Sequence, residues 1–280
     1  MKWGARGTTV SQSADRTFFT ARGPSDPGLA LFLNAGDPGL DQLLELVLLL
    51  DDAEVDCLEL AVPFPDSVTD GPVIRRSARR ALDNGVDLDA VLEFIGRVRP
   101  RLRHTKVALL ADWRHSVRPV GIEEFLRRSH DCGTDAVLLH GLPPRAGARY
   151  LEAAERTGQP IVTSCYAGSG PDVLAQAARH ATAYLYLVAH YGRSGTAPAP
   201  DARTLKPVLT ALRAMTAAPV AVGFGVRTGE DVRAMGALGA DAAIVGTALV
   251  DRIEQAQRSG GDLLAEVERF VTALRSAPVR

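Results

Sequence analysis

The chain has 280 residues, of which 46% are hydrophobic and 23% are charged. This composition is typical of a folded globular protein and excludes a chain that is disordered over most of its length. The 32 basic and 33 acidic side chains leave a formal net charge of −1, which gives the whole chain no electrostatic field for binding nucleic acid or an anionic membrane.

No segment of the chain predicts secretion or membrane insertion. The N-terminal segment lacks the short apolar core of a signal peptide, and no stretch approaches ~18 uninterrupted apolar residues. Cys57, Cys132 and Cys165 are odd in number and widely spaced, which predicts neither a disulfide framework nor a Cys-x-x-Cys metal site. We therefore expect a cytoplasmic protein with reduced thiols.

Residues 1–27 are predicted to be an N-terminal lead-in to the folded domain, poorly committed to any secondary structure. They are rich in Gly, Ser, Thr and Arg with little periodicity, and we expect little chemistry from them. No Pro- or Ser-rich linker divides the rest of the chain, so residues 28–280 are expected to form one domain.

Eight short apolar runs predict buried parallel strands. Each run is too short for a buried helix, and several are rich in β-branched residues or flanked by Gly or Pro. The runs lie at residues 29–33, 56–62, 106–111, 136–139, 160–165, 183–189, 219–224 and 241–246.

Amphipathic helical stretches alternate with these runs. They cover residues 40–53, 72–85, 88–102, 121–133, 149–158, 171–181, 205–215 and 229–240, and a final helix is expected around residues 262–274. Repeated strand–helix units require a parallel sheet, and eight units at this length predict a closed (β/α)8 TIM barrel. A doubly wound open sheet is the alternative, but it more often carries a Gly-rich signature after its first strand, where this chain has only NAGDPG at residues 34–39.

Two carboxylates are the main candidates for chemistry, because barrel active sites lie at the C-terminal ends of the strands. Glu59 interrupts the second apolar run, where a carboxylate is costly unless it is hydrogen-bonded, hydrated or functional. Burial would raise its pKa towards neutrality, which suits proton transfer. Asp70 either caps the helix that begins at Pro72 or joins Glu59 over the same cavity.

Small residues after the last three strands predict an anion site. The loop at residues 186–196 contains Gly195, and Gly225, Gly246 and Thr247 follow the seventh and eighth strands. Barrels frequently bind phosphate there, at the N-terminus of a short helix. Tight turns also require glycine, so each position alone is weak evidence.

Other residues near the strand ends carry weaker predictions. His115, His140 and His190 lie in separate loops without His-x-x-x-His spacing or a Cys pair, which argues against a metal site. Trp113 and Tyr184 either line a pocket for an aromatic ligand or are ordinary packing residues.

From Leu29 to about Glu254 the chain resembles the α subunit of tryptophan synthase. The most specific segment, LELAVPFPDSVTDGPVI at residues 58–74, is similar to the family's strand-two segment with "PFSDP" and "ADGP". The motifs YLYL, GFGV and GTALV then follow in the family's order. The resemblance implies a TIM barrel that cleaves indole-3-glycerol phosphate to indole and glyceraldehyde 3-phosphate, with no cofactor and no metal.

The resemblance also implies a role for each matching residue. Glu59 is the implied general acid/base, and Asp70 is implied to accept a hydrogen bond from the indole N–H. Tyr186 matches the tyrosine of the active-site strand. The implied phosphate cradle is Gly195, Gly225, Gly246 and Thr247, and the implied aromatic positions around the indole are Phe32 and Phe224.

The departures from the family concern the surface that contacts a PLP-dependent β subunit. Asp66 is retained, but Ser67 replaces the following proline, and Gly141 replaces an aspartate tied to loop communication. The segment after the third strand reads Asp112-Trp113-Arg114 instead of a tyrosine- and asparagine-containing motif. Retained catalytic residues with altered partner contacts predict a stand-alone lyase that releases free indole for specialised metabolism.

Three alternatives remain open from the sequence. One is a partner-dependent alpha subunit of the tryptophan synthase complex, and another is a non-catalytic α-like activator of a partner, against which intact Glu59 and Asp70 argue. The third is another phosphosugar-binding barrel of tryptophan or histidine biosynthesis. Such barrels normally use lysine at the catalytic strand ends, whereas Lys106 opens the third run at its N-terminal end.

Overall fold

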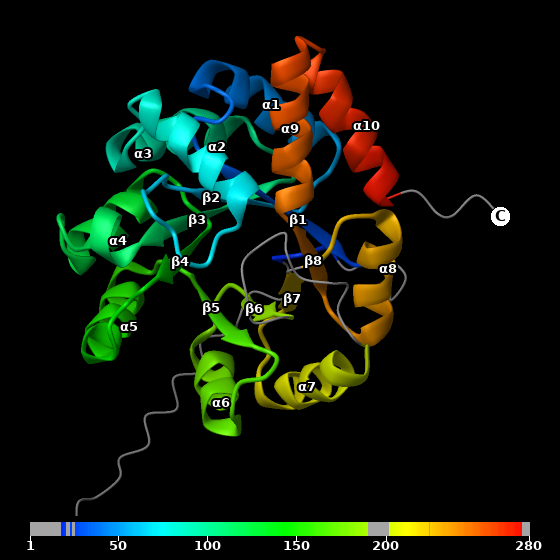
Figure 1. Cartoon of the computed structure of the whole chain (residues 1–280). Coiled ribbons are helices and arrows are strands. Elements are labelled where there is room, and N and C mark those ends of the chain that lie inside the picture. Colours follow the sequence, from blue (N-terminus) through cyan, green and yellow to red (C-terminus); the bar gives the residue numbers. More distant parts are fainter. Residues whose placement is uncertain (1–17, 21–22, 24–25, 190–201, 224, 276–280) are drawn as a thin grey trace, which may run out of the picture.

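Eight parallel strands close into a barrel with helices around it (Figure 1). This computed structural model describes residues 18–20, 23, 26–189, 202–223 and 225–275. Each strand pairs with its neighbour in chain order and β8 pairs with β1, so the prediction of a (β/α)8 barrel is confirmed. The strands are β1 (Gly28–Asn34), β2 (Cys57–Ala61), β3 (Lys106–Asp112), β4 (Ala136–His140), β5 (Ile161–Tyr166), β6 (Leu185–Val188), β7 (Val220–Gly223) and β8 (Ala242–Val245).

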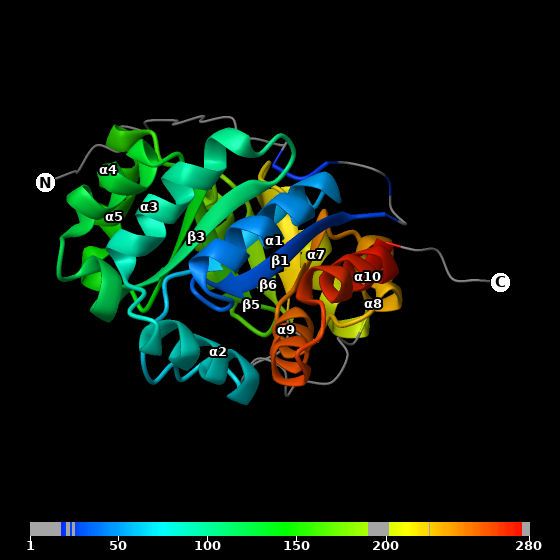
Figure 2. The same ribbon diagram turned by 90° about the horizontal axis from the view of Figure 1, so that it is seen from above.

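Helices connect the strands over the outside of the barrel (Figure 2). They are α1 (Leu40–Asp52), α2 (Pro72–Asp83), α3 (Leu88–Val98), α4 (Ile122–Asp131), α5 (Gly147–Thr157), α6 (Pro171–His180), α7 (Ala202–Met215), α8 (Gly229–Leu238), α9 (Thr247–Ser259) and α10 (Leu263–Arg275). Shorter turns are η1 (Arg99–Arg101), η2 (Trp113–Val117) and η3 (Pro144–Ala146). The helices expected from periodicity are present with slightly moved ends. Helix α9 was not among the helices expected from periodicity, because its apolar first turn continues the apolar run of β8.

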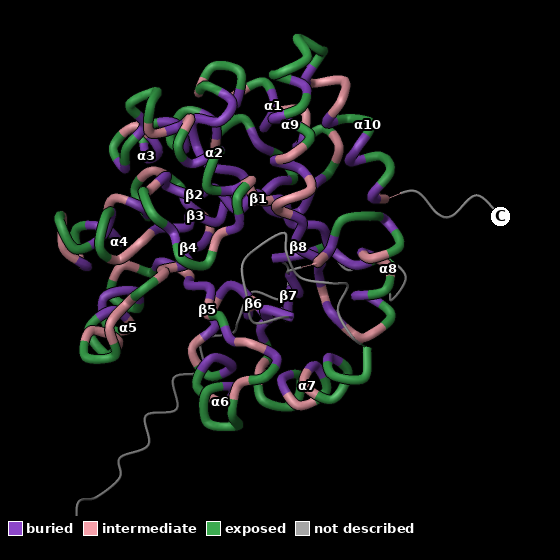
Figure 3. Tube along the Cα trace, in the orientation of Figure 1, coloured by how far each residue is buried: buried purple, intermediate pink, exposed green. Residues whose placement is uncertain are grey.

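Alternation along the strands divides their apolar side chains between two clusters. One set, which includes Leu31 and Leu58, packs against the surrounding helices. The other set faces the barrel interior, and the central strands are buried while the outer faces of the helices are exposed (Figure 3). Much of this inner set is small and leaves room for one large ring, that of the fully buried Tyr184. Its alanines are Ala30, Ala61, Ala108, Ala136, Ala183, Ala221 and Ala242.

Two aromatic residues of the lead-in close the N-terminal end of the barrel. Phe18 and Phe19 are buried, and their ring centroids lie 5.0 and 5.2 Å from that of Tyr184. Lys106 begins β3 at the same end, with its Nζ 4.8 Å from the centroid of the Phe18 ring. The lysine therefore lies away from the C-terminal strand ends, as expected. The domain boundary at residue 28 stays a prediction.

A buried carboxylate joins α2 to α9, which lie side by side (Figures 1 and 2). Glu254 of α9 accepts hydrogen bonds of 2.9 and 2.6 Å from Arg76 and of 2.8 Å from Arg80, both on α2. Arg80 also donates to Asp37, which follows β1, at 2.9 and 2.7 Å. The hydrogen bonds from Arg76, with the charge of Arg80, hold the pKa of Glu254 at about 2. This network fixes the two helices relative to each other.

Replacing Glu254 with Gln is expected to lower the free energy of unfolding by about 2 kcal/mol near neutral pH, because hydrogen bonds to charged groups contribute about 1.5 to 3 kcal/mol. The folded-state pKa is depressed, so this contribution is present above the unfolded-state value of 4.5 and is lost as the pH falls towards about 2. Urea unfolding across this pH range measures it.

The matched control is Glu124→Gln. Glu124 pairs with Arg127 on the exposed face of α4, where solvent screens the ion pair and its contribution to stability is small. Equal destabilisation by the two variants, or a Glu254→Gln effect that does not depend on pH, would contradict a structural role for the buried network.

Candidate active site

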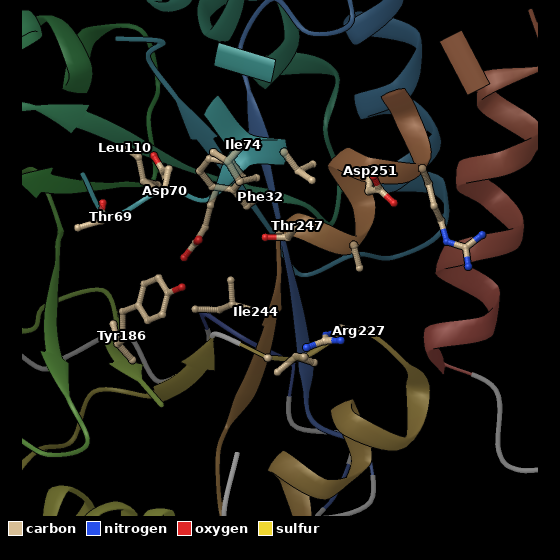
Figure 4. A pocket seen from close by; sticks show the side chains of 18 of the residues that line it. Phe32, Thr69, Asp70, Ile74, Leu110, Tyr186, Arg227, Ile244, Thr247 and Asp251 are labelled. Atoms are coloured by element: carbon tan, nitrogen blue, oxygen red, sulfur yellow. The ribbon is translucent and has the colours of Figure 1, made fainter. Parts of the chain in front are cut away.

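A cavity of about 610 Å³ opens at the C-terminal ends of the strands. Figure 4 shows Asp70, Phe32, Tyr186 and Thr247 around it. Predicted residues Gly195 and Phe224 lie outside the described residues. All the other predicted site residues line this one cavity: Phe32, Glu59, Asp70, Tyr186, Gly225, Gly246 and Thr247.

Glu59 is the buried acid of the cavity. It lies on β2 with 1% of its surface exposed, and its Oε1 accepts a 2.6 Å hydrogen bond from the Tyr184 hydroxyl. Burial raises the pKa of Glu59 to about 7, although the bond from Tyr184 opposes this shift. Glu59 can therefore give up or take a proton near neutral pH.

Asp70 is the second carboxylate of the cavity. It lies in the loop after β2, where its backbone N–H donates to the Ser67 hydroxyl at 3.3 Å. Among the described side chains, none caps α2, whose N-cap residue is Gly71. The helix-capping alternative for Asp70 is therefore wrong, and its half-buried carboxylate faces the cavity instead.

Tyr186 contributes a neutral phenol from β6. Burial, together with the nearby charges of Glu59 and Asp70, raises the pKa of its hydroxyl. The phenol ring occupies the space that a Cβ atom on Gly223 would need. Glycine at the end of β7 is therefore a steric requirement for the Tyr186 ring in this position.

The opposite end of the cavity suits an anion. Helix α9 begins at Thr247, and none of the described side chains caps its N-terminus. The first N–H groups of a helix have no partner within the helix and carry partial positive charge, so they attract phosphate. Gly225 has a φ of 88°, a left-handed conformation that favours glycine, and Gly246 lies so close to Phe32 that a Cβ would contact its Cβ at 3.3 Å.

Sequence reasoning missed several polar side chains of the site. Tyr184 is neither a cavity wall nor a simple packing residue, because it lies beneath the cavity and donates to Glu59. The Tyr-Leu-Tyr sequence carried a signal, since residues two apart on a strand share a face. His140, considered only as a metal ligand, lines the cavity with Ser164 and Tyr166. No pattern of spacing marked these three residues.

Other predictions from the sequence have a plainer outcome. Trp113 packs against the outer cluster and is not a cavity residue. Cys57, Cys132 and Cys165 are free thiols. Over the described ranges, no group of three or more His, Cys, Asp or Glu side chains is arranged to hold a metal ion. None of the helices in the described part of the chain combines the length and apolar character needed to cross a bilayer.

Comparisons of the sequence with known proteins all give the same family. The family model for the tryptophan synthase alpha chain matches residues 18–278. The chain is 34% identical to the tryptophan synthase alpha chain of Burkholderia thailandensis, over 93% of this chain and 94% of that protein. It is 35% identical to that of Gloeobacter violaceus, over 88% and 87% of the two chains.

Solved structures of similar proteins share the fold. The tryptophan synthase α subunit of Legionella pneumophila superposes with a TM-score of 0.78 at 27% identity, over 89% of this chain and 91% of that one. The subunit from Pyrococcus furiosus gives a TM-score of 0.79 at 29% identity, over 89% and 98%. The likeness therefore covers the whole barrel.

Replacing Tyr184 with Phe is expected to raise the pKa of Glu59 above about 7, because the lost hydroxyl favours the charged carboxylate and burial would act unopposed. A pH titration of ¹³C-labelled glutamate carboxyl carbons by NMR measures this shift.

The control for this titration is Tyr150→Phe. The Tyr150 hydroxyl is also buried, and it has no hydrogen-bond partner within the described structure. Its removal deletes the same atom elsewhere and should leave the Glu59 titration unchanged. An unshifted Glu59 titration in Tyr184→Phe would show that the bond has no electrostatic effect on the acid.

Proposed function

Because the chain belongs to the tryptophan synthase alpha chain family, we infer that it is a carbon–carbon lyase that cleaves indole-3-glycerol phosphate to indole and glyceraldehyde 3-phosphate. We propose further that it acts as a stand-alone enzyme in the cytoplasm and releases free indole, for use in specialised metabolism. The observation that carries the chemistry is that buried Glu59 and Asp70 share one cavity with the uncapped N-terminus of α9.

The substrate fits the cavity by its chemistry. Its phosphate takes the end formed by Gly225, Gly246 and Thr247, where backbone N–H groups and a helix terminus attract an anion. Its indole ring lies towards Asp70, with Phe32 and Leu110 as apolar walls. In this proposed orientation, the bond between the ring and the glycerol chain lies near Glu59.

Glu59 carries the proton transfers in this proposal. In its protonated form it donates a proton to C3 of the indole ring, which leaves a cationic ring and a carboxylate. The carboxylate then takes the proton of the glycerol hydroxyl as the carbon–carbon bond breaks, and the bonding electrons neutralise the ring. Glu59 ends protonated, as it began, and a pKa of about 7 suits both steps.

Asp70 and Tyr184 stabilise the charges that form during the reaction. The Asp70 carboxylate accepts a hydrogen bond from the ring N–H, an interaction that strengthens as the ring becomes cationic. The Tyr184 hydroxyl donates to Glu59 and so stabilises its carboxylate while the ring holds the proton.

Independence from a partner is supported by contacts within the chain that hold the loop carrying Asp70. Phe64 stacks on His115 with ring centroids 5.6 Å apart, and His115 Nδ1 lies 2.7 Å from the carboxylate of Asp112. Ser67 accepts from the backbone of Asp70 and lies 3.4 Å from the Thr69 hydroxyl. These contacts attach the loop to the end of β3 from within the chain.

One observation favours the partner-dependent alternative. Val68 is 81% exposed in this same loop, next to Asp66, which the family uses between subunits. An exposed apolar side chain in the loop that carries Asp70 suits a docking surface for a β subunit. Activity measured with and without a β subunit therefore decides between the stand-alone enzyme and the partner-dependent subunit.

Glu59→Gln is expected to lower kcat by about 10³-fold and leave KM nearly unchanged, since it removes proton transfer and keeps the shape of the site. Asp70→Asn should cost about 10²-fold. The control is Asp66→Asn, an exposed carboxylate of the same loop, which should leave turnover by the isolated chain unchanged. Near-normal turnover of Glu59→Gln would contradict its assignment as the proton donor.

Indole release by the isolated chain is expected to change less than about 3-fold when a tryptophan synthase β subunit is added in excess. Titration calorimetry of the same mixture should show no binding. Tight association, with release that rises strongly on addition of the partner, would return the protein to the ordinary two-subunit complex.

A further inference from the structure

One wall of the cavity carries polar side chains, whereas the benzene part of the indole ring, which would lie against it, is apolar. His140 ends β4, Tyr166 ends β5, and Ser164 precedes it by two residues on the same face of β5. In the closed strand order, β4 and β5 lie across the barrel from β8 and β1, where the N-terminus of α9 forms the anion end. A substrate with its phosphate at α9 therefore extends its ring towards this wall.

Unsubstituted indole offers no counterpart to the His140 imidazole or the Ser164 hydroxyl. Its only polar atom is the ring nitrogen, and the proposed contact with Asp70 already satisfies that N–H. The benzene part of the ring is apolar and would cover the His140 imidazole and the Ser164 hydroxyl without forming hydrogen bonds to them. Covering polar groups in this way costs free energy, because they lose their hydrogen bonds to water.

His140 is the centre of this wall. Burial lowers the pKa of its imidazole, against the opposing charges of Asp70 and Asp112, so the ring is neutral at physiological pH. A neutral imidazole offers one N–H donor and one nitrogen acceptor. Within the described structure the ring makes no hydrogen bond, and it lines the cavity with the Ser164 hydroxyl. A donor and an acceptor side by side match a hydroxyl group on a ligand.

We propose that this wall, formed by His140, Ser164 and Tyr166, recognises a hydroxyl group on the benzene part of the indole ring, so that the preferred substrate is a ring-hydroxylated indole-3-glycerol phosphate. The inference rests on the proposed lyase function and narrows its substrate class. The product would be a hydroxyindole and glyceraldehyde 3-phosphate. A hydroxylation must then precede this step in the reaction sequence.

The test is a comparison of five substrates with one readout. Indole-3-glycerol phosphate and its four analogues with a hydroxyl at C4, C5, C6 or C7 are cleaved by the isolated chain, and glyceraldehyde 3-phosphate is followed with a coupled dehydrogenase. At least one analogue is expected to exceed the parent compound by about 10-fold or more in kcat/KM, the equivalent of one good hydrogen bond.

Two variants locate the preference on the polar wall. His140→Leu and Ser164→Ala should each reduce the ratio between the best analogue and the parent, and His140→Leu should bring it to about 1. His130→Leu is the matched control, because His130 is exposed on α4 and should leave the ratio unchanged.

The outcomes separate this inference from the function on which it rests. Cleavage of the parent at a rate equal to or above all four analogues would overturn the inference and leave the lyase function intact. A preference for one analogue that survives both His140→Leu and Ser164→Ala would overturn the assignment to this wall. No cleavage of any of the five compounds would contradict the proposed function and this inference together.

Discussion

The hydrogen bond between Tyr184 and Glu59 is the interaction on which the rest of the site depends. A carboxyl group buried inside a barrel is tolerated only with a partner, and burial is also what brings its pKa into the neutral range. The tyrosine has room because the barrel interior is lined with alanines, and Phe18 and Phe19 pack against its ring from the N-terminal end. Small residues at the bottom of the barrel therefore support the acid at its top.

The two ends of the cavity are joined on the outside of the barrel. Helix α2 begins directly after the loop that carries Asp70, and α9 begins at the anion end with Thr247. The bonds of Glu254 to Arg76 and Arg80 hold these two helices together. None of the residues of this network lines the cavity, yet the network holds the helix that follows Asp70 against the helix that begins at the anion end.

Much of the fold could be predicted because the strands of a parallel barrel are short, apolar and regularly spaced. Glu59 stood out for the same reason, since a carboxylate in such a run needs an explanation. Its partner Tyr184 is 125 residues away, and no local pattern joins the two. The polar wall at His140 and Ser164 was missed because side chains from separate strands meet only once the barrel closes. Helix α9 was not predicted, because strand β8 and this helix share one apolar run.

The pH dependence of kcat/KM for cleavage of indole-3-glycerol phosphate by the isolated chain tests the central claim most directly. A proton donor with a pKa of about 7 predicts a rate that is constant at lower pH and falls about tenfold per unit above that value. Glu59→Gln should show no such limb in its residual rate. A profile that is flat through neutrality, or one whose limb persists in Glu59→Gln, would show that the proton comes from another group.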